Sequence, residues 1–471
     1  EKASCFNISN VNSTENNCEN IQSLLGVKIN PQASEEHKNE LCGVLREYKD
    51  VFGENSDKLG NFPIEAPILT KENTSIYIKQ HPISAAYKDK VENEIEKMLE
   101  LGVIEKCDNP RWWNSPILCV PKKDGSVRVC ANFKRTINTV MCESSDKFQM
   151  PDTNNLFHEI GKNNNFFSTL DIRSGYWQFS IKNQDKHKTS FQLDNQTYCF
   201  KRLPMGLKNS GDIFCRAITG ILQKVKNKKN FKSFVDDLII HSENFKVYLD
   251  TLKNIFDIFR NHNIRLNGSK CEFLFKKAKF LGRIIDNEGY KADPDNVSAV
   301  KALEPPKSQK QVSQAIGRFN WLRDFISSNI GEEVAKFCFS ELISELNKLN
   351  KKNSKFNWTE RAQECFENTK NRFSSDKCIS FANFNEPFTL VTDASGIAVA
   401  GILLQIENGK QKIIGCISKT LSKTEQRWSA TEREAYAILY CVEKFSYFLK
   451  GPKPFILLTD HKCLTFMDKN V

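Results

Sequence analysis

The feature that most constrains this chain is a pair of adjacent carboxylates inside an apolar run, Phe234-Val235-Asp236-Asp237-Leu238-Ile239-Ile240. Such a run is typical of a buried hairpin that carries the two acids at its turn. Two desolvated carboxylates side by side repel each other, so the pair requires cations nearby. An Asp-Asp turn without any chemical role is the alternative, because Asp favours turns.

A third acid in a similar setting favours a catalytic role. Asp171 closes the apolar strand predicted over Ser168–Leu170. Three strand-borne Asp residues in a chain of net charge +11 are what two-metal phosphoryl transfer requires. Two Mg²⁺ ions, or Mn²⁺ in their place, would activate an attacking hydroxyl and stabilise the leaving oxygen.

The basic surplus is concentrated in two stretches. The first contains Lys224, Lys226, Lys228, Lys229 and Lys232. The second contains Lys270, Lys276, Lys277, Lys279 and Arg283, interleaved with Phe273, Phe275 and Phe280. Basic residues that alternate with aromatics are typical of a groove along a nucleic-acid backbone, with rings available for stacking. A solvated charged face over core phenylalanines is the alternative.

The periodicity predicts two mixed α/β regions on either side of a helical spacer. Residues 1–33 show little periodicity and are predicted to be a flexible leader. Hairpins are predicted over Pro116–Cys130, with an Asp-Gly turn, and over Thr189–Phe200. An amphipathic helix is predicted from the spacing of Leu249, Leu252, Ile255, Phe256 and Phe259. A further helix is predicted to begin with Thr359 as its N-cap. The last predicted helix has Ile438, Leu439, Val442, Phe445 and Leu449 on one face.

Neither a membrane span nor a zinc site is expected. No stretch approaches ~18 consecutive apolar residues, and no signal peptide is visible. The sixteen cysteines are scattered without any C-x-x-C pair, so a structural zinc site is disfavoured and reduced, mostly buried thiols are predicted.

Six motifs occur in a family order. They are Asn114-Ser115-Pro116 with Lys122-Lys123-Asp124-Gly125, Leu170-Asp171-Ile172-Arg173-Ser174-Gly175-Tyr176, Leu203-Pro204-Met205-Gly206-Leu207-Lys208-Asn209, Phe234-Val235-Asp236-Asp237, Lys270-Cys271-Glu272-Phe273 and Phe280-Leu281-Gly282-Arg283. In these motifs the chain, from Lys49 to Val471, resembles the Pol polyprotein of gypsy-type LTR retrotransposons and retroviruses, in its reverse transcriptase and ribonuclease H part.

The resemblance implies roles for the first set of acids and their neighbours. Asp171 and Asp236 would hold both Mg²⁺ ions, and Asp237 would complete the acidic site. Tyr176 matches the aromatic residue next to the sugar 2′ position, where a bulky ring excludes ribonucleotides. An ordinary core tyrosine is the alternative. Asn132 departs from the usual Asp of the family, which puts fidelity and nucleotide affinity in doubt more than the reaction type.

The remaining substrate contacts are also implied by the resemblance. Lys122 and Arg128 match the fingers cations that bind the incoming triphosphate. Phe280, Leu281 and Gly282 match the hairpin that grips the primer end. Lys270 is a candidate for protonating the pyrophosphate leaving group, with a plain phosphate contact as the alternative.

A second acidic set lies near the end of the chain. Asp393, Glu434 and Asp460 match the metal-binding carboxylates of the family's ribonuclease H, which cleaves the RNA strand of a hybrid. Glu434 is preferred over Glu432 because it faces the edge of the apolar stripe. The fourth carboxylate of the family would lie beyond Val471, so we expect impaired ribonuclease H activity from these residues alone.

The implied fold is an α/β (α+β) right-hand polymerase with fingers, palm and thumb, followed by a ribonuclease H-like domain. The expected parts are a flexible leader and short helix (1–62), fingers and palm (63–290), a helical thumb-like segment (291–350), a connecting segment (351–384) and a C-terminally incomplete ribonuclease H-like domain (385–471). Expected partners are RNA and DNA template–primers, RNA–DNA hybrids and dNTPs, with no membrane; the sequence does not predict the oligomeric state. A cytoplasmic location, virus-like particles included, is expected.

Three interpretations of function follow. The leading one is an RNA-directed DNA polymerase, a nucleotidyltransferase, with an attached ribonuclease H-like domain. The second is an inactive nucleic-acid-binding remnant of such an element. The third, a general DNA repair polymerase, is disfavoured by the hybrid-cleaving domain.

Overall fold

The computed structural model describes residues 18–52, 59–107, 112–122, 125–142, 148–326, 339–351, 356–451 and 453–466. The chain divides into two compact units. Unit 1 comprises Glu1–Pro151 and Asn165–Phe275, and unit 2 comprises Asp152–Asn164 and Lys276–Val471. Within the described residues, no helix combines the length and the apolar character needed to cross a bilayer.

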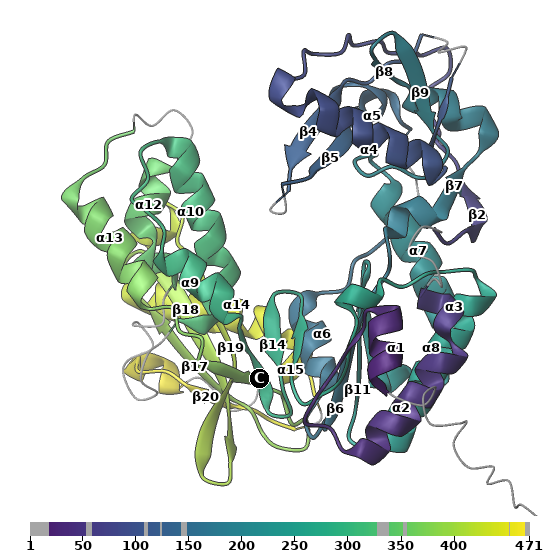
Figure 1. Cartoon of the computed structure of the whole chain (residues 1–471). Coiled ribbons are helices and arrows are strands. Elements are labelled where there is room, and N and C mark those ends of the chain that lie inside the picture. The colour runs from purple at the N-terminus through teal and green to yellow at the C-terminus, as the bar shows by residue number, and fades with distance from the viewer. Residues whose placement is uncertain are drawn as a thin grey trace, which may run out of the picture. The chain divides into compact units, whose positions relative to one another are not determined.

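A five-stranded sheet with the order β1-β12-β6-β11-β10 forms the base of unit 1. Its strands are β1 (Lys28–Ile29), β6 (Phe166–Asp171), β10 (Phe231–Phe234), β11 (Asp237–Ser242) and β12 (Glu272–Phe275). Strands β10 and β11 form the expected hairpin, and β11 pairs antiparallel with β6. Helix α8 (Phe245–Asn261) lies beside this sheet (Figure 1) and buries the predicted stripe, including Leu252, Ile255 and Phe259.

Smaller sheets and helices complete unit 1. The strands are β2 (Phe62–Ala66), β3 (Ile104–Lys106), β4 (Ile117–Pro121), β5 (Val127–Ala131), β7 (Phe179–Ile181), β8 (Phe191–Leu193) and β9 (Gln196–Phe200), and the helices are α4 (Lys88–Glu100), α5 (Ile137–Val140) and α7 (Ser210–Leu222). Both predicted hairpins are present, as β4–β5 and β8–β9. The β8–β9 turn contains Asp194 and Asn195 at φ 45° and 64°, a conformation that these two residue types tolerate well. Asp124 of the predicted Asp-Gly turn lies outside the described residues.

The N-terminal segment is more ordered than predicted. Residues 18–52 contain α1 (Cys18–Leu25), β1, α2 (Glu35–Glu47) and α3 (Lys49–Phe52), so the prediction of a leader up to residue 33 is wrong for its described part. Val27 and Ile29 are buried because β1 pairs with β12, about 240 residues away, and no local pattern reveals such a contact. The prediction of reduced thiols is also wrong for Cys18, which forms a disulfide with Cys42.

Unit 2 begins with α6 (Thr153–Ile160) and the sheet of β13 (Ala278–Phe280), β14 (Arg283–Ile285), β15 (Gly289–Ala292) and β16 (Cys378–Ser380). The helical segment contains α9 (Pro294–Lys301), α10 (Gln309–Leu322), α11 (Phe339–Leu342), α12 (Ser344–Leu349) and α13 (Glu360–Asn371). Thr359 caps α13 as expected, because its side chain accepts a hydrogen bond from the Ala362 N–H.

The second part of unit 2 is a four-stranded sheet with the order β19-β18-β17-β20. Its elements are β17 (Thr389–Ala394), β18 (Ala398–Glu407), β19 (Lys410–Thr420), α14 (Ala430–Lys444), α15 (Ser446–Leu449) and β20 (Ile456–Leu458). The predicted stripe of the last helix is partly wrong, because Leu439 is 55% exposed. The buried face runs through Ala437, Cys441 and Phe445, since Gly401 leaves room in β18 for Cys441.

Candidate active sites

The first acidic cluster forms where β6 ends and the β10–β11 hairpin turns. Asp171, the last residue of β6, pairs across the sheet with Asp237, the first residue of β11. Asp236 lies in the turn, and its carbonyl accepts a hydrogen bond from the Ile172 N–H at 3.3 Å. Val235 in the same turn has φ 55°, a strained conformation for a β-branched residue. The register of the sheet therefore brings the three predicted acids together.

Five of the ten predicted polymerase residues line one cavity of about 850 Å³. Asp171, Tyr176, Asp236, Arg128 and Lys270 all contribute to its wall. Asp237 is not among the described residues that line it. The cavity is therefore bordered by two carboxylates and by three cations, since Arg173 also lines it, whereas the third carboxylate does not border it.

Burial and mutual repulsion raise the pKa of two carboxyl groups in this cluster, Asp171 and Asp237. The Lys270 Nζ lies 3.1 Å from Asp171 Oδ2. Burial raises the pKa of Asp171, and the contact with Lys270 opposes that rise. Burial, together with the charges of Asp236 and Asp171, raises the pKa of Asp237 to about 6. The two carboxylates that border the cavity, Asp171 and Asp236, offer oxygen ligands of the kind that divalent cations prefer.

Tyr176 faces the cavity and is held from behind by the core. It belongs to the 3₁₀ turn Gly175–Gln178, and its ring centroid lies 5.1 Å from that of Phe214. A Cβ on Gly175 would lie 2.8 Å from Phe214 Cε2, so only glycine allows this close packing. Burial raises the pKa of the Tyr176 hydroxyl, and the charge of Asp236 adds to the effect. The tyrosine thus combines a core contact with a surface on the cavity.

Lys122 and Arg128 lie on the β4–β5 hairpin. Both side chains are exposed, and both line a smaller cavity of about 170 Å³. This cavity shares Arg128, Ser174 and Met205 with the larger one. The two residues predicted to bind the triphosphate, Lys122 and Arg128, therefore lie together beside the first acidic cluster.

The predicted primer hairpin belongs to unit 2. Leu281 and Gly282 form the β13–β14 turn at φ 48° and 70°. Phe280 and Phe273 are 2% and 0% exposed, so the expectation that these rings are available for stacking is wrong. Within β13, alternate positions point to opposite faces, so Lys279 is exposed between buried Ala278 and Phe280. Lys276 and Lys277 are exposed in the connection between β12 and β13.

One wall of the larger cavity was missed by the sequence reasoning. Ser23, Leu24, Leu25 and Gly26, at the end of α1, line it together with the loop that carries Lys270. A Cβ on Gly268 would lie 1.8 Å from the Leu25 carbonyl oxygen, so the two segments are in tight contact. No local pattern predicts this wall, because the contacting segments are about 240 residues apart.

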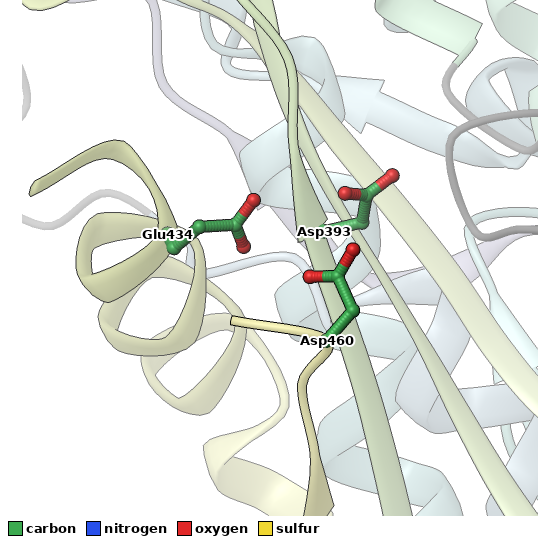
Figure 2. Close-up of side chains that lie close together, drawn as sticks. All are labelled: Asp393, Glu434 and Asp460. Carbon is green, nitrogen blue, oxygen red and sulfur yellow. The ribbon is translucent and has the colours of Figure 1, made fainter. Parts of the chain in front are cut away.

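The second acidic cluster combines three elements of unit 2. Asp393 is in β17, Glu434 is in the second turn of α14, and Asp460 follows β20. Carboxylate oxygens of the three residues lie within 4.8 Å of one another, and Figure 2 shows them directed toward a common point. Thr431 Oγ1 and His461 Nε2 lie 3.2 Å apart, which links the first turn of α14 to the residue after Asp460.

Glu434, and not Glu432, faces the other two acids. Glu434 is buried, and its Oε1 accepts a hydrogen bond from the Ala394 N–H at 3.0 Å. Its Oε2 is buried without a hydrogen-bond partner in the described part of the chain. Burial and the charges of Asp393 and Asp460 raise the pKa of Glu434 to about 7. The unpartnered oxygen between two further carboxylates fits a divalent cation.

Glu432 has a different local role. Its carboxylate accepts hydrogen bonds from the backbone N–H and the hydroxyl of Ser429 in a capping box at the start of α14. These bonds lower the pKa of Glu432. The residue stabilises the helix terminus at the surface and does not join the acidic cluster.

Two family models match the chain. Residues 120–285 match "Reverse transcriptase (RNA-dependent DNA polymerase)". Residues 358–457 match "RNase H-like domain found in reverse transcriptase". The first acidic cluster and the second therefore fall in two separately matched domains, apart from Asp460, which follows the second match by three residues.

Relatives and solved structures agree with these matches. The Pol polyprotein of transposon opus from Drosophila melanogaster is 33% identical over 93% of this chain and 44% of its own length. That of transposon gypsy from the same organism is 30% identical over 91% of this chain and 41% of its own length. The chain thus spans less than half of these relatives.

Foamy viral protease–reverse transcriptases are similar in structure at 20% identity. The structure in complex with double-stranded DNA has a TM-score of 0.78 and covers 96% of this chain and 76% of that one. The structure in complex with an RNA/DNA hybrid has a TM-score of 0.75 and covers 93% and 57%. This likeness confirms the predicted α/β reverse transcriptase fold.

Proposed function

Since this chain carries a reverse transcriptase domain and the RNase H-like domain of reverse transcriptases and is a relative of retrotransposon Pol polyproteins, we propose that it is an RNA-directed DNA polymerase. It extends a primer with dNTPs on an RNA or DNA template, and its second domain acts on RNA–DNA hybrids. The observation that carries the proposal is the 850 Å³ cavity, in which two carboxylates, a tyrosine and three cations face one space. These are the groups that nucleotidyl transfer requires.

The chain's own residues have distinct roles in this reaction. Arg128 and Lys122 bind the triphosphate, and Tyr176 restricts the space beside the sugar 2′ position. Lys270 lies 3.1 Å from Asp171 and is able to neutralise or protonate the leaving pyrophosphate. Asp171 and Asp236 would hold Mg²⁺ or Mn²⁺, which when bound supplies charge stabilisation for the attacking and leaving oxygens.

The second domain is proposed to cleave the RNA strand of hybrids. Asp393, Glu434 and Asp460 would hold the divalent cation that supports hydrolysis there. Support comes from the 4.8 Å limit on the distances between their oxygens and from the unpartnered Glu434 Oε2. Template–primers and RNA–DNA hybrids are the proposed partners, in line with the nucleic acids bound to the two foamy viral structures.

Primer extension tests the proposal. The purified chain is incubated with a labelled DNA primer on matched RNA and DNA templates, with dNTPs and Mg²⁺, and a parallel reaction contains excess chelator. We expect extension on both templates and none with the chelator. Binding of the template–primer without extension on either template would instead support an inactive nucleic-acid-binding remnant.

A further inference from the structure

Gln178 is a fully buried amide close to the first acidic cluster. It is 1% exposed, ends the 3₁₀ turn that carries Tyr176, and follows Asp171 by seven positions. Its Nε2 donates to the carbonyl of Arg173 at 2.6 Å and to that of Arg265 at 2.8 Å. Its Oε1 accepts from the Arg265 N–H at 2.8 Å. Both donors of the side chain are therefore used for backbone groups.

These hydrogen bonds connect segments that are far apart in sequence. Arg173 lies two residues after the end of β6, whereas Arg265 lies between α8 and the loop that carries Lys270. A third segment closes the site, because a Cβ on Gly60 would lie 2.0 Å from Gln178 Oε1 and 2.5 Å from the Asn263 carbonyl oxygen. The amide is thus enclosed on every side that the structure describes, and the sequence has glycine where a larger residue would displace it.

The same segments fix the catalytic residues. The Arg173 N–H donates to the Arg265 carbonyl at 3.0 Å, and the Asn267 N–H donates to the Asp171 carbonyl at 2.9 Å. Three residues after Asn267 comes Lys270, whose Nζ contacts Asp171. In between, Ser174 has φ 44°, a strained conformation at the start of the turn that presents Tyr176 to the cavity.

We propose that Gln178 is a positioning residue for sugar selection: its amide holds the turn that presents Tyr176 at a fixed place relative to Asp171 and the Lys270 loop. The inference rests on the proposed polymerase function. Without the amide, the carbonyl of Arg173 loses its partner and the turn relaxes from its strained conformation. The Tyr176 ring no longer excludes ribonucleotides when it shifts, since a displacement of ~1 Å at a reacting centre changes the reaction rate by up to about 10²-fold.

Two substitutions disrupt the hydrogen bonds of the Gln178 side chain in different ways. Gln178→Met keeps a side chain of similar length and removes all three hydrogen bonds. Gly60→Ala leaves Gln178 in place and forces the amide away through the added Cβ. If Gln178→Met fails to fold, Gly60→Ala still decides the question.

Matched controls separate positioning from stability. Tyr248→Phe removes two hydrogen bonds of a fully buried palm residue. The Tyr248 hydroxyl pairs with Ser168 Oγ at 2.5 Å and accepts from the Leu274 N–H at 3.3 Å, and the residue does not line the cavity. Gly43→Ala introduces the same methyl group in α2, where nothing lies within 4 Å of the new Cβ. Tyr176→Val serves as the reference for a variant that no longer discriminates between dNTP and rNTP.

The experiment compares kcat/KM for a dNTP and the matching rNTP, and hydrogen exchange of peptides covering residues 171–178 and 263–268. We expect Gln178→Met and Gly60→Ala to lower the dNTP-over-rNTP ratio roughly tenfold or more, toward that of Tyr176→Val. Exchange should accelerate in both peptides. Tyr248→Phe and Gly43→Ala should keep the wild-type ratio.

Two results would overturn the inference. One is an unchanged dNTP-over-rNTP ratio in both Gln178→Met and Gly60→Ala while their melting temperatures fall as in Tyr248→Phe. In that case Gln178 contributes to stability only. The other is unchanged exchange in both peptides. If the wild-type chain extends no primer at all, the proposed function fails, and the exchange measurement alone then decides whether Gln178 holds the turn.

Discussion

The two acidic clusters of this chain differ in how their negative charge is balanced. In unit 1, Lys270 Nζ lies 3.1 Å from Asp171, and Arg128 borders the same cavity. In unit 2, Glu434 Oε2 is buried without a hydrogen-bond partner in the described residues, and the oxygens of three carboxylates lie within 4.8 Å. The first cluster therefore carries a resident cation, whereas the second leaves a buried oxygen that a proton or a bound cation would satisfy.

The clusters also differ in how the backbone builds them. Asp171 and Asp237 face each other by sheet register, and Asp236 follows from the hairpin turn. The second cluster requires a strand, a helix and a strand end to meet, and only Glu434 among its acids is buried. We therefore expect single substitutions in the first cluster to have the larger effect on polymerase activity. We expect metal binding and pH to have the larger effect on the local stability of the second cluster.

The largest effect is expected from Asp236→Asn. The substitution removes a proposed metal ligand, and a loss of several kcal/mol of transition-state stabilisation corresponds to about a thousandfold or more in extension rate. Template–primer binding should persist, because it rests on contacts of Lys and Arg with phosphates. Extension rate and binding affinity are measured side by side.

The control is Asp250→Asn, an exposed residue of α8 outside the cavity. It should extend primers like the wild type. Near-native extension by Asp236→Asn would show that the metal assignment of the first cluster is wrong.

A large effect on cation binding is expected from Glu434→Gln. A metal ion at a concentration about a hundredfold above its Kd stabilises the folded site by ~2.7 kcal/mol. This stabilisation slows hydrogen exchange at the site by about a hundredfold. Mn²⁺ should therefore slow exchange in residues 389–394 and 430–437 of the wild type but not of Glu434→Gln. Exchange is followed by mass spectrometry with and without Mn²⁺.

Glu432→Gln provides the matched control two positions away. Glutamine still completes the capping box with Ser429, so this variant should keep the Mn²⁺ effect. Equal protection by Mn²⁺ in both variants would contradict the assignment of Glu434.

A smaller effect on extension is expected from Asp237→Asn. Asp237 does not line the 850 Å³ cavity within the described residues, and burial raises its pKa to about 6. Its substitution should cost about tenfold in rate, equivalent to ~1.4 kcal/mol. Single-turnover extension under the conditions used for Asp236→Asn makes the comparison. A loss equal to that of Asp236→Asn would place Asp237 among the direct ligands.

The smallest effect concerns the pH dependence of stability without metal. The folded protein raises the pKa of Glu434 from 4.5 to about 7, so it holds this proton more tightly than the unfolded chain does. The free energy of unfolding contributed by Glu434 should therefore fall as pH rises from about 4.5 to about 7.

Thermal unfolding in a chelator at several pH values measures this contribution. The melting temperature of Glu434→Gln should decline less over that window than that of the wild type, because glutamine does not titrate. A larger decline of the melting temperature in Glu434→Gln than in the wild type would contradict the raised pKa of Glu434 in the folded protein.

Local patterns predicted the elements that carry the chemistry. The β10–β11 hairpin, the helix over Leu249–Phe259 and the Thr359 cap follow from periodicity, turn residues and capping, which act within a few residues. The choice of Glu434 over Glu432 came from the family resemblance together with the position of Glu434 at the edge of the apolar stripe. The amphipathic stripe of α14 was predicted with Leu439 inside, because hydrophobicity alone does not show that Gly401 admits Cys441 instead.

By itself, the sequence determined the family resemblance, the elements of both acidic clusters and the residue types available for catalysis, because these depend on neighbours along the chain. Only the tertiary structure decided that α1 forms a wall of the polymerase cavity, that Asp236 lines this cavity while Asp237 does not, and that Gln178 bonds to Arg173 and Arg265. Those contacts join segments tens to hundreds of residues apart. They depend on close packing and backbone hydrogen bonding in three dimensions, for which the order of residues carries no local signal.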